Sequence, residues 1–243
     1  MKTKGFWIGG KHAVLEALKN YNRKIYKIVT TEENIKLIDQ DVLKYKEITL
    51  DIKQKKEIDK IFQNEDIIHQ NFASEIENLP SENIKDYLKK TLNKKSVIVV
   101  LDDITDQRNI GSIVRSCVAF SVDCIVLLDK NFNSKSKIMF KTASGALEYI
   151  KIFSVSNISN TLKVLKEYNF WIYALDQNAK DVITNNLKSE KIALVFGSEE
   201  FGIRKLVKEN CDFQIKIPIK NIESLNVSNA VAVTLGLYRY LNN

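Results

Sequence analysis

Polar residues crowd the entrance to the most apolar segment of the chain, close to its C-terminus. Residues 224–229 read Ser-Leu-Asn-Val-Ser-Asn and stand directly before an apolar run at residues 230–241. A single Ser or Asn is enough to cap the first turn of a helix. This segment therefore holds more hydrogen-bonding groups than capping requires, and the excess predicts a site at the mouth of a buried helix.

An acidic segment follows the apolar run at residues 97–101, where residues 102–106 read Asp-Asp-Ile-Thr-Asp. Many nucleotide-binding α/β domains carry a Gly-rich phosphate loop at such a place. No G-x-G-x-x-G or Walker pattern occurs in this chain. Because an acidic turn repels a pyrophosphate, the sequence disfavours NAD and ATP. A cofactor with a cationic centre, such as the sulfonium of S-adenosylmethionine, suits this turn better.

The helix expected after this turn has one apolar face and one small-residue face. Its apolar residues recur with the helical period, at Ile110, Ile113, Val114, Cys117 and Val118. The opposite side carries Gly111, Ser112, Arg115 and Ala119. Arg115 thus projects from a face that leaves room for a bulky ligand, with Asn109 at the helix start. The alternative is an ordinary solvated arginine on a surface helix.

A third candidate segment lies after another apolar run. Gly197 and Gly202 flank Ser198-Glu199-Glu200-Phe201. Glycines at such a turn allow the backbone to approach a ligand closely. The alternative is a plain turn from a strand into a helix.

The charge balance and the cysteines indicate the class of protein. The net charge is +7 and the pI is about 9.1, which suits a polyanionic partner. Only five of the 37 basic residues are arginine, so arginine is expected where a planar multi-donor fork is needed. The three cysteines are widely spaced and predict reduced core residues, with no metal-binding cluster. Without a signal peptide or a long apolar run, we expect a soluble cytoplasmic protein with no membrane partner.

The pattern of apolar runs predicts an α/β fold. Short continuous runs at residues 97–101, 124–128, 171–175 and 192–196 are typical of strands buried on both faces of a parallel sheet. The first 75 residues alternate helical and extended patterns, with strands expected at residues 25–29 and 67–68. Residues 76–94 are polar and Lys-rich and predict a linker with a short helix. The alternative is a surface helix of one continuous domain.

In their order, the segments 101–115, 194–203 and 217–228 resemble the three motifs of the SpoU (TrmH-like) family of RNA ribose 2′-O-methyltransferases. Residues 9–18 are similar to the start of the RNA-binding domain that many members carry. The resemblance implies a small α/β (L30e-like) RNA-binding domain at 1–75, a linker at 76–94 and a catalytic domain at 95–243. It also implies a SPOUT-type parallel sheet with a deep trefoil knot, which no pattern in the residues predicts.

The resemblance further implies S-adenosylmethionine as cofactor, RNA as partner, and a homodimer formed through the C-terminal helix. The implied catalytic residues are Asn109, Arg115, Glu199, Ser224 and Asn226. The implied cofactor-binding residues are Leu175, Gly197, Gly202, Ile217, Pro218 and Leu225. Lys11, His12, His69 and Gln70 mix hydrogen-bond donors and acceptors near Phe72 and are the expected RNA contacts. No metal is implied.

The proton of the ribose hydroxyl has two candidate acceptors. Arginine is a poor base, yet both histidines, His12 and His69, lie in the N-terminal part. The two remaining candidates are Arg115 assisted by an RNA phosphate, and Glu199. We expect Arg115 to orient and acidify the hydroxyl.

The two-domain layout is closest overall to the members that methylate a guanosine of 23S rRNA. A tRNA-directed enzyme and a non-catalytic ribosome-assembly factor are the alternatives. The chain departs from the family pattern at Glu200, where a glycine is usual. It departs again at residues 219–223, which lack the usual glycine and are one residue short.

Overall fold

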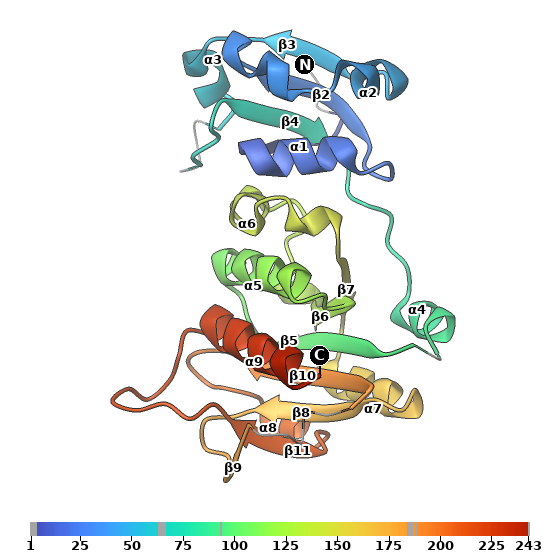
Figure 1. Cartoon of the computed structure of the whole chain (residues 1–243), viewed down its shortest axis with the longest axis vertical. Coiled ribbons are helices and arrows are strands. Elements are labelled where there is room, and N and C mark those ends of the chain that lie inside the picture. Colours follow the sequence, from blue (N-terminus) through green and yellow to red (C-terminus); the bar gives the residue numbers. More distant parts are fainter. Residues whose placement is uncertain (1–3, 63–66, 93, 184–186, 188, 243) are drawn as a thin grey trace. The chain divides into compact units, whose positions relative to one another are not determined.

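The computed structural model describes residues 4–62, 67–92, 94–183, 187 and 189–242, and the chain forms two compact units (Figure 1). The first unit holds residues 1–80 and 133–149, and the second holds residues 81–132 and 150–243. Residues 133–149, which the sequence interpretation assigned to the domain at 95–243, thus group with the N-terminal residues. Residue 93 of the predicted linker lies outside the described residues.

The first unit is built on a four-stranded sheet in the order β1-β4-β2-β3. Its strands are β1 (Phe6–Gly9), β2 (Ile25–Thr30), β3 (Thr49–Ile52) and β4 (Phe72–Ile76). Strand β4 pairs antiparallel with β1 and β2, whereas β2 and β3 are parallel. The connections contain α1 (Lys11–Lys19), η1 (Glu32–Leu37), α2 (Gln40–Tyr45) and α3 (Lys55–Asp59). The strand predicted at residues 25–29 is confirmed by β2.

The strand predicted at residues 67–68 is wrong. Strand β4 begins only at Phe72, after a turn in which Gln70 and Asn71 have φ values of 53° and 63°. Residue Ile67 instead packs in a small apolar cluster with Phe62. A short apolar run fits such a cluster as well as a strand, because periodicity does not distinguish the two.

A buried ion pair holds the segment 133–149 in the first unit. This segment contains α6 (Lys137–Ala143) and η3 (Ala146–Glu148). The guanidinium of Arg23 donates to the Glu148 carboxylate at 2.9–3.2 Å, and the two side chains are only 3% and 1% exposed. Arg23 also donates to the Glu77 carbonyl oxygen at 2.7 Å. Since a buried charge without a partner is costly, the pair fixes both parts of the chain together.

The second unit contains a seven-stranded sheet in the order β7-β6-β5-β10-β8-β11-β9. Its strands are β5 (Ser96–Asp102), β6 (Cys124–Leu128), β7 (Lys151–Val155), β8 (Trp171–Leu175), β9 (Asp181–Val182), β10 (Lys191–Gly197) and β11 (Phe213–Lys216). The strand pairs described in it are parallel. The four predicted buried strands are β5, β6, β8 and β10, so the α/β class and the parallel sheet are confirmed.

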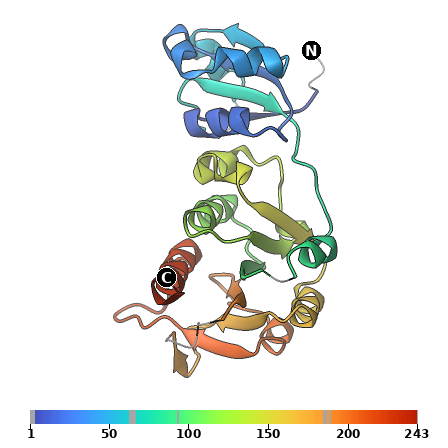
Figure 2. The ribbon, with the colours of Figure 1, turned by 45° about the vertical axis from the view of Figure 1, so that its right-hand side comes forward.

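Helices cover both faces of this sheet (Figure 2). The apolar core of one face joins alternate strand residues to α4 (Ile84–Lys90), α7 (Ile158–Glu167) and α8 (Lys205–Lys208). On the other face, α5 (Gln107–Ala119) packs against α9 (Val227–Asn242). Side chains of a strand alternate between the faces, which explains why the central strands are apolar without interruption.

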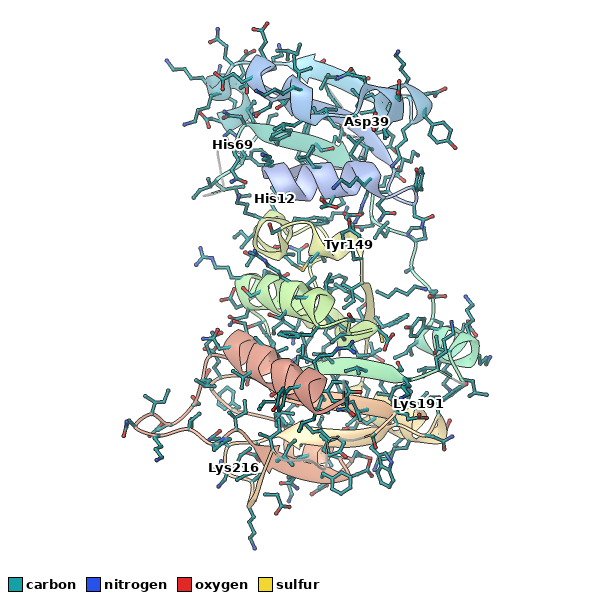
Figure 3. The ribbon with its side chains drawn as sticks, in the orientation of Figure 1. His12, Asp39, His69, Tyr149, Lys191 and Lys216 are labelled. Carbon is teal, nitrogen blue, oxygen red and sulfur yellow. The ribbon has the colours of Figure 1, made fainter. Side chains whose placement is uncertain are left out.

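Because the strands are parallel, their carboxyl ends lie on the same side of the sheet, which we call the carboxyl edge. In Figure 3, Lys191 at the amino end of β10 and Lys216 at the carboxyl end of β11 lie at opposite edges. The segments that follow β5, β8, β10 and β11 therefore lie at the carboxyl edge, where Lys216 ends β11. Ligands of open α/β sheets bind at this edge.

Three features of the described residues concern the state of the cysteines, metal binding and membrane-spanning helices. Cys117 and Cys124 are buried free thiols, and burial raises the pKa of both. The described residues contain no group of three or more His, Cys, Asp or Glu side chains arranged to hold a metal ion. Among the described helices, none is both long and apolar enough to cross a bilayer.

Candidate functional site

Side chains from all three motifs meet in one hydrogen-bonded cluster, formed by Asn109, Glu199 and Asn226. The Asn226 side-chain amide donates to Glu199 Oε1 at 2.6 Å and to Asn109 Oδ1 at 3.1 Å. Asn109 Nδ2 also donates to Glu199 Oε1, at 3.1 Å. The three residues lie 27 to 117 positions apart in the chain, so the fold alone brings them together.

Asn226 performs two tasks at the start of α9. Its Oδ1 accepts from the Ser228 N–H at 3.0 Å, and its carbonyl oxygen accepts from the Ala230 N–H at 3.0 Å, so it is the N-cap of the helix. An amide oxygen used in this way leaves the amide nitrogen to face Glu199. The excess of polar groups before α9 thus has a structural reason: the cap residue also holds the carboxylate.

Among the described residues, the Glu199 carboxylate is bound through one of its two oxygens. Its Oε1 accepts from two side-chain amides and from the Val227 N–H at 3.4 Å, at the positive end of α9. No described residue hydrogen-bonds to its Oε2. Because Glu199 is exposed, this second oxygen is available to a hydroxyl group from outside the chain.

A closed loop carries Glu199. Ser198 and Gly202 form an antiparallel bridge, with N–H···O distances of 3.2 and 2.9 Å. Gly202 has a φ of +65°, and a Cβ at Gly197 would overlap the Gly202 backbone. Both glycines of the second motif are therefore required by the loop itself. Their role in cofactor binding stays a prediction.

A buried carboxylate anchors this loop to strand β5. Arg204 donates to Asp102 from its backbone N–H at 2.9 Å and from its guanidinium at 2.9 and 2.5 Å. Asp102 is fully buried, and its strand position pairs with Gly197. The acidic turn of the first motif thus uses its first Asp to hold the second motif. Sequence analysis gave the acidic turn only an electrostatic role and did not predict the pairing of Asp102 with Arg204.

The turn between β5 and α5 is held at both ends. Asp106 caps α5 by accepting from an N–H of its first turn at 2.8 Å. Asn131 donates to Asp103 at 3.0 Å, and its carbonyl oxygen accepts from Gln107 at 2.8 Å. The hydrogen bond from Asn131 holds the pKa of Asp103 below its ordinary value. This network fixes the start of α5 beside the site.

Arg115 lies on the exposed face of α5 and outside the Asn109–Glu199–Asn226 cluster. With a rise of about 1.5 Å per residue, it is about 9 Å along the helix from Asn109. Its side chain has no hydrogen-bond or ion-pair partner among the described residues. The guanidinium is therefore available for a group outside the chain.

A cavity of about 670 Å³ opens at the same edge of the sheet. Its size is that of a small-molecule site. It is lined by predicted cofactor or catalytic residues, namely Leu175, Gly197, Glu199, Gly202, Ile217, Ser224 and Leu225. Pro218, Asn109, Arg115 and Asn226 are not among its lining residues. The predicted cofactor set is thus brought together around one cavity, with Pro218 as the exception.

Sequence reasoning missed part of the cavity wall. Asp176, Gln177 and Asn178 follow β8 directly and line the cavity, as does Lys208, which pairs with Asp176. Gln177 donates to the Ile217 carbonyl oxygen at 3.2 Å and so ties two wall segments together. Burial opposes ionisation of Asp176, but the hydrogen bond from Lys208 holds its pKa below the ordinary value. Polar residues directly after a buried strand were the available signal.

The four predicted RNA contacts lie in the first unit (Figure 3 labels His12 and His69). His12 is exposed and Lys11 is half-buried at the start of α1. Gln70 Oε1 accepts from the Lys11 N–H at 3.3 Å and from Lys141 Nζ at 2.8 Å.

His69 lies inside the first unit, unlike His12. It is buried and stacks on Phe62, and its Nε2 lies 2.7 Å from Asp59 Oδ1. The Asn71 N–H donates to His69 Nδ1 at 3.0 Å. Both ring nitrogens of His69 therefore have partners inside the chain, with the proton on Nε2 in the neutral ring.

The comparison with protein families decides what the chain is related to. The family described as the SpoU rRNA Methylase family matches residues 96–236, more than half of the chain. The chain belongs to the SpoU family. A second family, described as RNA 2′-O ribose methyltransferase substrate binding, matches residues 7–81. The resemblance drawn from the three motifs is thereby confirmed.

Individual relatives of this SpoU chain are also named as methyltransferases. It is 38% identical to an uncharacterized tRNA/rRNA methyltransferase of Borreliella burgdorferi, over 76% of this chain and 85% of that protein. It is also 38% identical to the 23S rRNA (guanosine-2′-O-)-methyltransferase RlmB of Blochmanniella floridana, over 69% of this chain and 67% of that protein. The AdoMet-bound rRNA methyltransferase of Sinorhizobium meliloti has the same fold, with a TM-score of 0.78, 18% identity, and coverage of 98% and 88%.

Proposed function

We propose that this chain transfers a methyl group from S-adenosylmethionine to a ribose 2′-hydroxyl of structured RNA, with a guanosine of 23S rRNA as the target. The observation that carries the proposal is the Asn109–Glu199–Asn226 cluster, which joins all three motifs. It leaves one carboxylate oxygen of Glu199 available beside a cavity of small-molecule size. The identity to the Blochmanniella floridana enzyme supports the choice of 23S rRNA.

The cavity lining fits a cationic cofactor. Its ionisable residues are Asp176, Glu199, Glu200, Glu223, Lys208 and Lys216, so carboxylates outnumber ammonium groups by four to two. One of the two lysines, Lys208, is already paired with Asp176. S-adenosylmethionine, when bound, supplies an electrophilic methyl group on a positively charged sulfur. Backbone of Leu175, Ile217 and Leu225 would hold it, with the loop 197–202 closing one wall.

The chain's own residues position the hydroxyl. Asn109 and Asn226 fix the Glu199 carboxylate through Oε1, so that Oε2 receives the hydrogen bond of the 2′-hydroxyl. A fixed near-attack geometry lowers a barrier by as much as about 7–11 kcal/mol. Ser224 lines the cavity beside Leu225 and limits the space on the side of the incoming ribose.

Arg115 supplies the positive charge. Its guanidinium orients and acidifies the hydroxyl, because a nearby cation stabilises the alkoxide that forms as the proton leaves. The proton passes either to Glu199 or to an RNA phosphate that Arg115 holds. A pH–rate profile separates these routes, since a Glu199→Gln variant removes the first acceptor and leaves the second.

We assign residues 1–75 to RNA recruitment, 76–94 to the connection and 95–243 to methyl transfer. The match of residues 7–81 to a substrate-binding family supports the first assignment. Exposed apolar residues Val233, Leu237 and Tyr240 share one face of α9, which supports a homodimer formed through this helix. The SPOUT-type fold of the relatives supports a trefoil knot in the second unit. An rRNA substrate would place the enzyme in the cytoplasm.

A tRNA-directed methyltransferase is the enzymatic alternative, and the Borreliella burgdorferi relative carries both substrates in its name. A non-catalytic assembly factor is the alternative from another class. The intact cluster of Asn109, Glu199 and Asn226 opposes it, because such a factor has no need of a positioned carboxylate.

The deciding experiment uses S-adenosylmethionine labelled in its methyl group, together with in vitro-transcribed 23S rRNA and a transcribed tRNA pool. We expect label in one ribose of the 23S transcript, located by mapping of 2′-O-methyl sites. Arg115→Ala should abolish transfer while cofactor affinity, measured by calorimetry, stays near the wild-type value. Undiminished transfer by this variant contradicts the role of Arg115. Label in tRNA alone selects the tRNA alternative.

A further inference from the structure

The arginines of this chain divide into two groups by what they contact. Only five of its 37 basic residues are arginine. Three hold internal hydrogen bonds: Arg23 with Glu148, Arg204 with Asp102, and Arg239 with the carbonyl oxygens of Phe120 and Ser121. The side chains of the other two, Arg108 and Arg115, have no hydrogen-bond or ion-pair partner within the described part of the chain. Both are exposed and both belong to α5.

The two arginines share one side of α5. Arg108, Ser112 and Arg115 follow the i, i+4, i+7 spacing that places residues on one helical face. Ser112 is half-buried between the two exposed guanidinium-bearing residues. With a rise of about 1.5 Å per residue, the two arginines stand about 10 Å apart along the helix. They form a short positive stripe that ends at Arg108.

This stripe runs beside the proposed site of methyl transfer. Arg108 directly precedes Asn109, whose side chain holds Glu199. Asp106, the acidic residue nearest to Arg108 in sequence, caps α5 and accepts from the Arg108 backbone N–H at 2.8 Å. Asp103 is paired with Lys130 at 2.9 Å. These two carboxylates therefore have partners other than the Arg108 side chain, which is exposed.

We infer that Arg108 binds a phosphate group of the RNA that flanks the target ribose. The inference rests on the proposed function, because a ribose placed at Glu199 brings its own neighbouring phosphates to the surface of α5. A guanidinium recognises a phosphate through two parallel N–H···O bonds, which a lysine ammonium does not reproduce. Arg108 thus fixes the backbone of the substrate, while Arg115 acts on the hydroxyl.

The test measures how RNA binding depends on salt. Each phosphate contact contributes about 0.7 to the slope of log K against log salt for single-stranded nucleic acid. With in vitro-transcribed 23S rRNA as the probe, we expect Arg108→Gln to reduce the slope by about that amount and to raise KM for the RNA. Binding of S-adenosylmethionine by calorimetry should be unchanged. Arg108→Lys should restore the slope but only part of the affinity.

The matched control is Lys163→Gln on α7, an exposed cation on the face of the sheet opposite to α5. It should leave the slope and KM unchanged, which separates a local contact from loss of net charge. Glutamine is a good helix former, so the melting temperature should stay within the range of the wild type for both variants.

Two results overturn the inference: a wild-type slope for Arg108→Gln, or an equal reduction of the slope by Lys163→Gln. Failure of the proposed function gives a different result, because the wild-type protein itself would then not methylate the transcript.

Discussion

Arg204 reaches across the sheet edge to Asp102 and makes three hydrogen bonds to its carboxylate, of 2.9, 2.9 and 2.5 Å. The Asp102 side chain has no exposure, whereas that of Arg204 is 44% exposed. The pair therefore ties the end of β5 to the segment that follows the Glu199 loop. We expect the position of Glu199 to depend on this pair, although neither Asp102 nor Arg204 lines the cavity.

Asp102→Asn keeps the size of this side chain and removes its charge. We expect the free energy of unfolding to fall by about 1–3 kcal/mol, because the donors of Arg204 lose a charged acceptor and the new amide nitrogen cannot accept a hydrogen bond. The turnover number should fall further than KM, since the loop that carries Glu199 loses its anchor. Urea unfolding and steady-state kinetics measure the two effects. Glu190→Gln is the control, because its pair with Lys95 is about 80% exposed and is worth under about 1 kcal/mol.

Asn226→Asp tests the hydrogen bonding around Glu199. The new carboxylate would replace an amide donor that lies 2.6 Å from Glu199 Oε1. Two carboxylates at this distance raise the pKa of one of them, so the cluster forms only when the pair holds a proton. We expect low activity at neutral pH and partial recovery as the pH falls, in a kcat/KM profile. A flat profile, or the same profile for the surface variant Asn169→Asp, would count against the assignment.

The two glycines of the second motif should respond differently to alanine. Gly202 has a positive φ but open space around its Cβ position, so Gly202→Ala should cost about 1–2 kcal/mol of backbone strain. A Cβ at Gly197 would overlap the Gly202 backbone, so Gly197→Ala should displace the whole loop. Displacement of about 1 Å costs about 100-fold in rate. Equal kinetics for the two variants would refute this account of the loop.

Asp176 makes the cavity wall sensitive to acid. The hydrogen bond from Lys208 holds its pKa below the ordinary value of 3.8, against the effect of burial. A carboxylate whose pKa is lower in the folded state stabilises the fold above pH 3.8, and this contribution is lost as the pH falls through the folded-state pKa. The unfolding free energies of wild type and Asp176→Asn should thus differ more at pH 6 than at pH 3. The difference should stay below about 1 kcal/mol.

The buried pair in the first unit should be the most sensitive ion pair to single substitution. Glu148→Gln leaves the Arg23 charge buried without its partner and should cost about 3–5 kcal/mol in urea unfolding. A double variant, Arg23→Met with Glu148→Leu, should recover much of this loss because no charge remains buried. A double variant less stable than Glu148→Gln would show that the charges themselves stabilise the unit.

Strands β5, β6, β8 and β10 could be predicted from local patterns, whereas the candidate site residues were predicted from the family resemblance of the three motifs. Buried parallel strands are apolar without interruption, and the three motifs carry polar groups directly after such strands, so both leave a mark in the sequence. The pairing of Arg23 with Glu148 spans 125 positions and leaves none. The same holds for Asp102 and Arg204, which are 102 positions apart. The partners of a buried charge depend on tertiary packing, which no local pattern encodes.

His69 illustrates the same limit from another side. Its position beside Gln70 and Phe72 favoured an RNA contact by residue type alone. In the structure its ring is buried between Phe62, Asp59 and the Asn71 N–H. Residue types that serve recognition also serve packing, and only burial separates the two. Its predicted contact with RNA therefore remains untested, and His12 offers the exposed ring of the two.

The first unit is discontinuous along the chain, and this has a consequence for synthesis on the ribosome. The chain leaves the unit after residue 80 and returns to it only at residue 133. Domains generally fold in the order in which they are synthesised. Arg23, however, can pair with Glu148 only after β5, α5 and β6 have been synthesised, because these elements precede Glu148 in the chain. Closure of the N-terminal unit is therefore a late event, which follows the appearance of the central strands of the second unit.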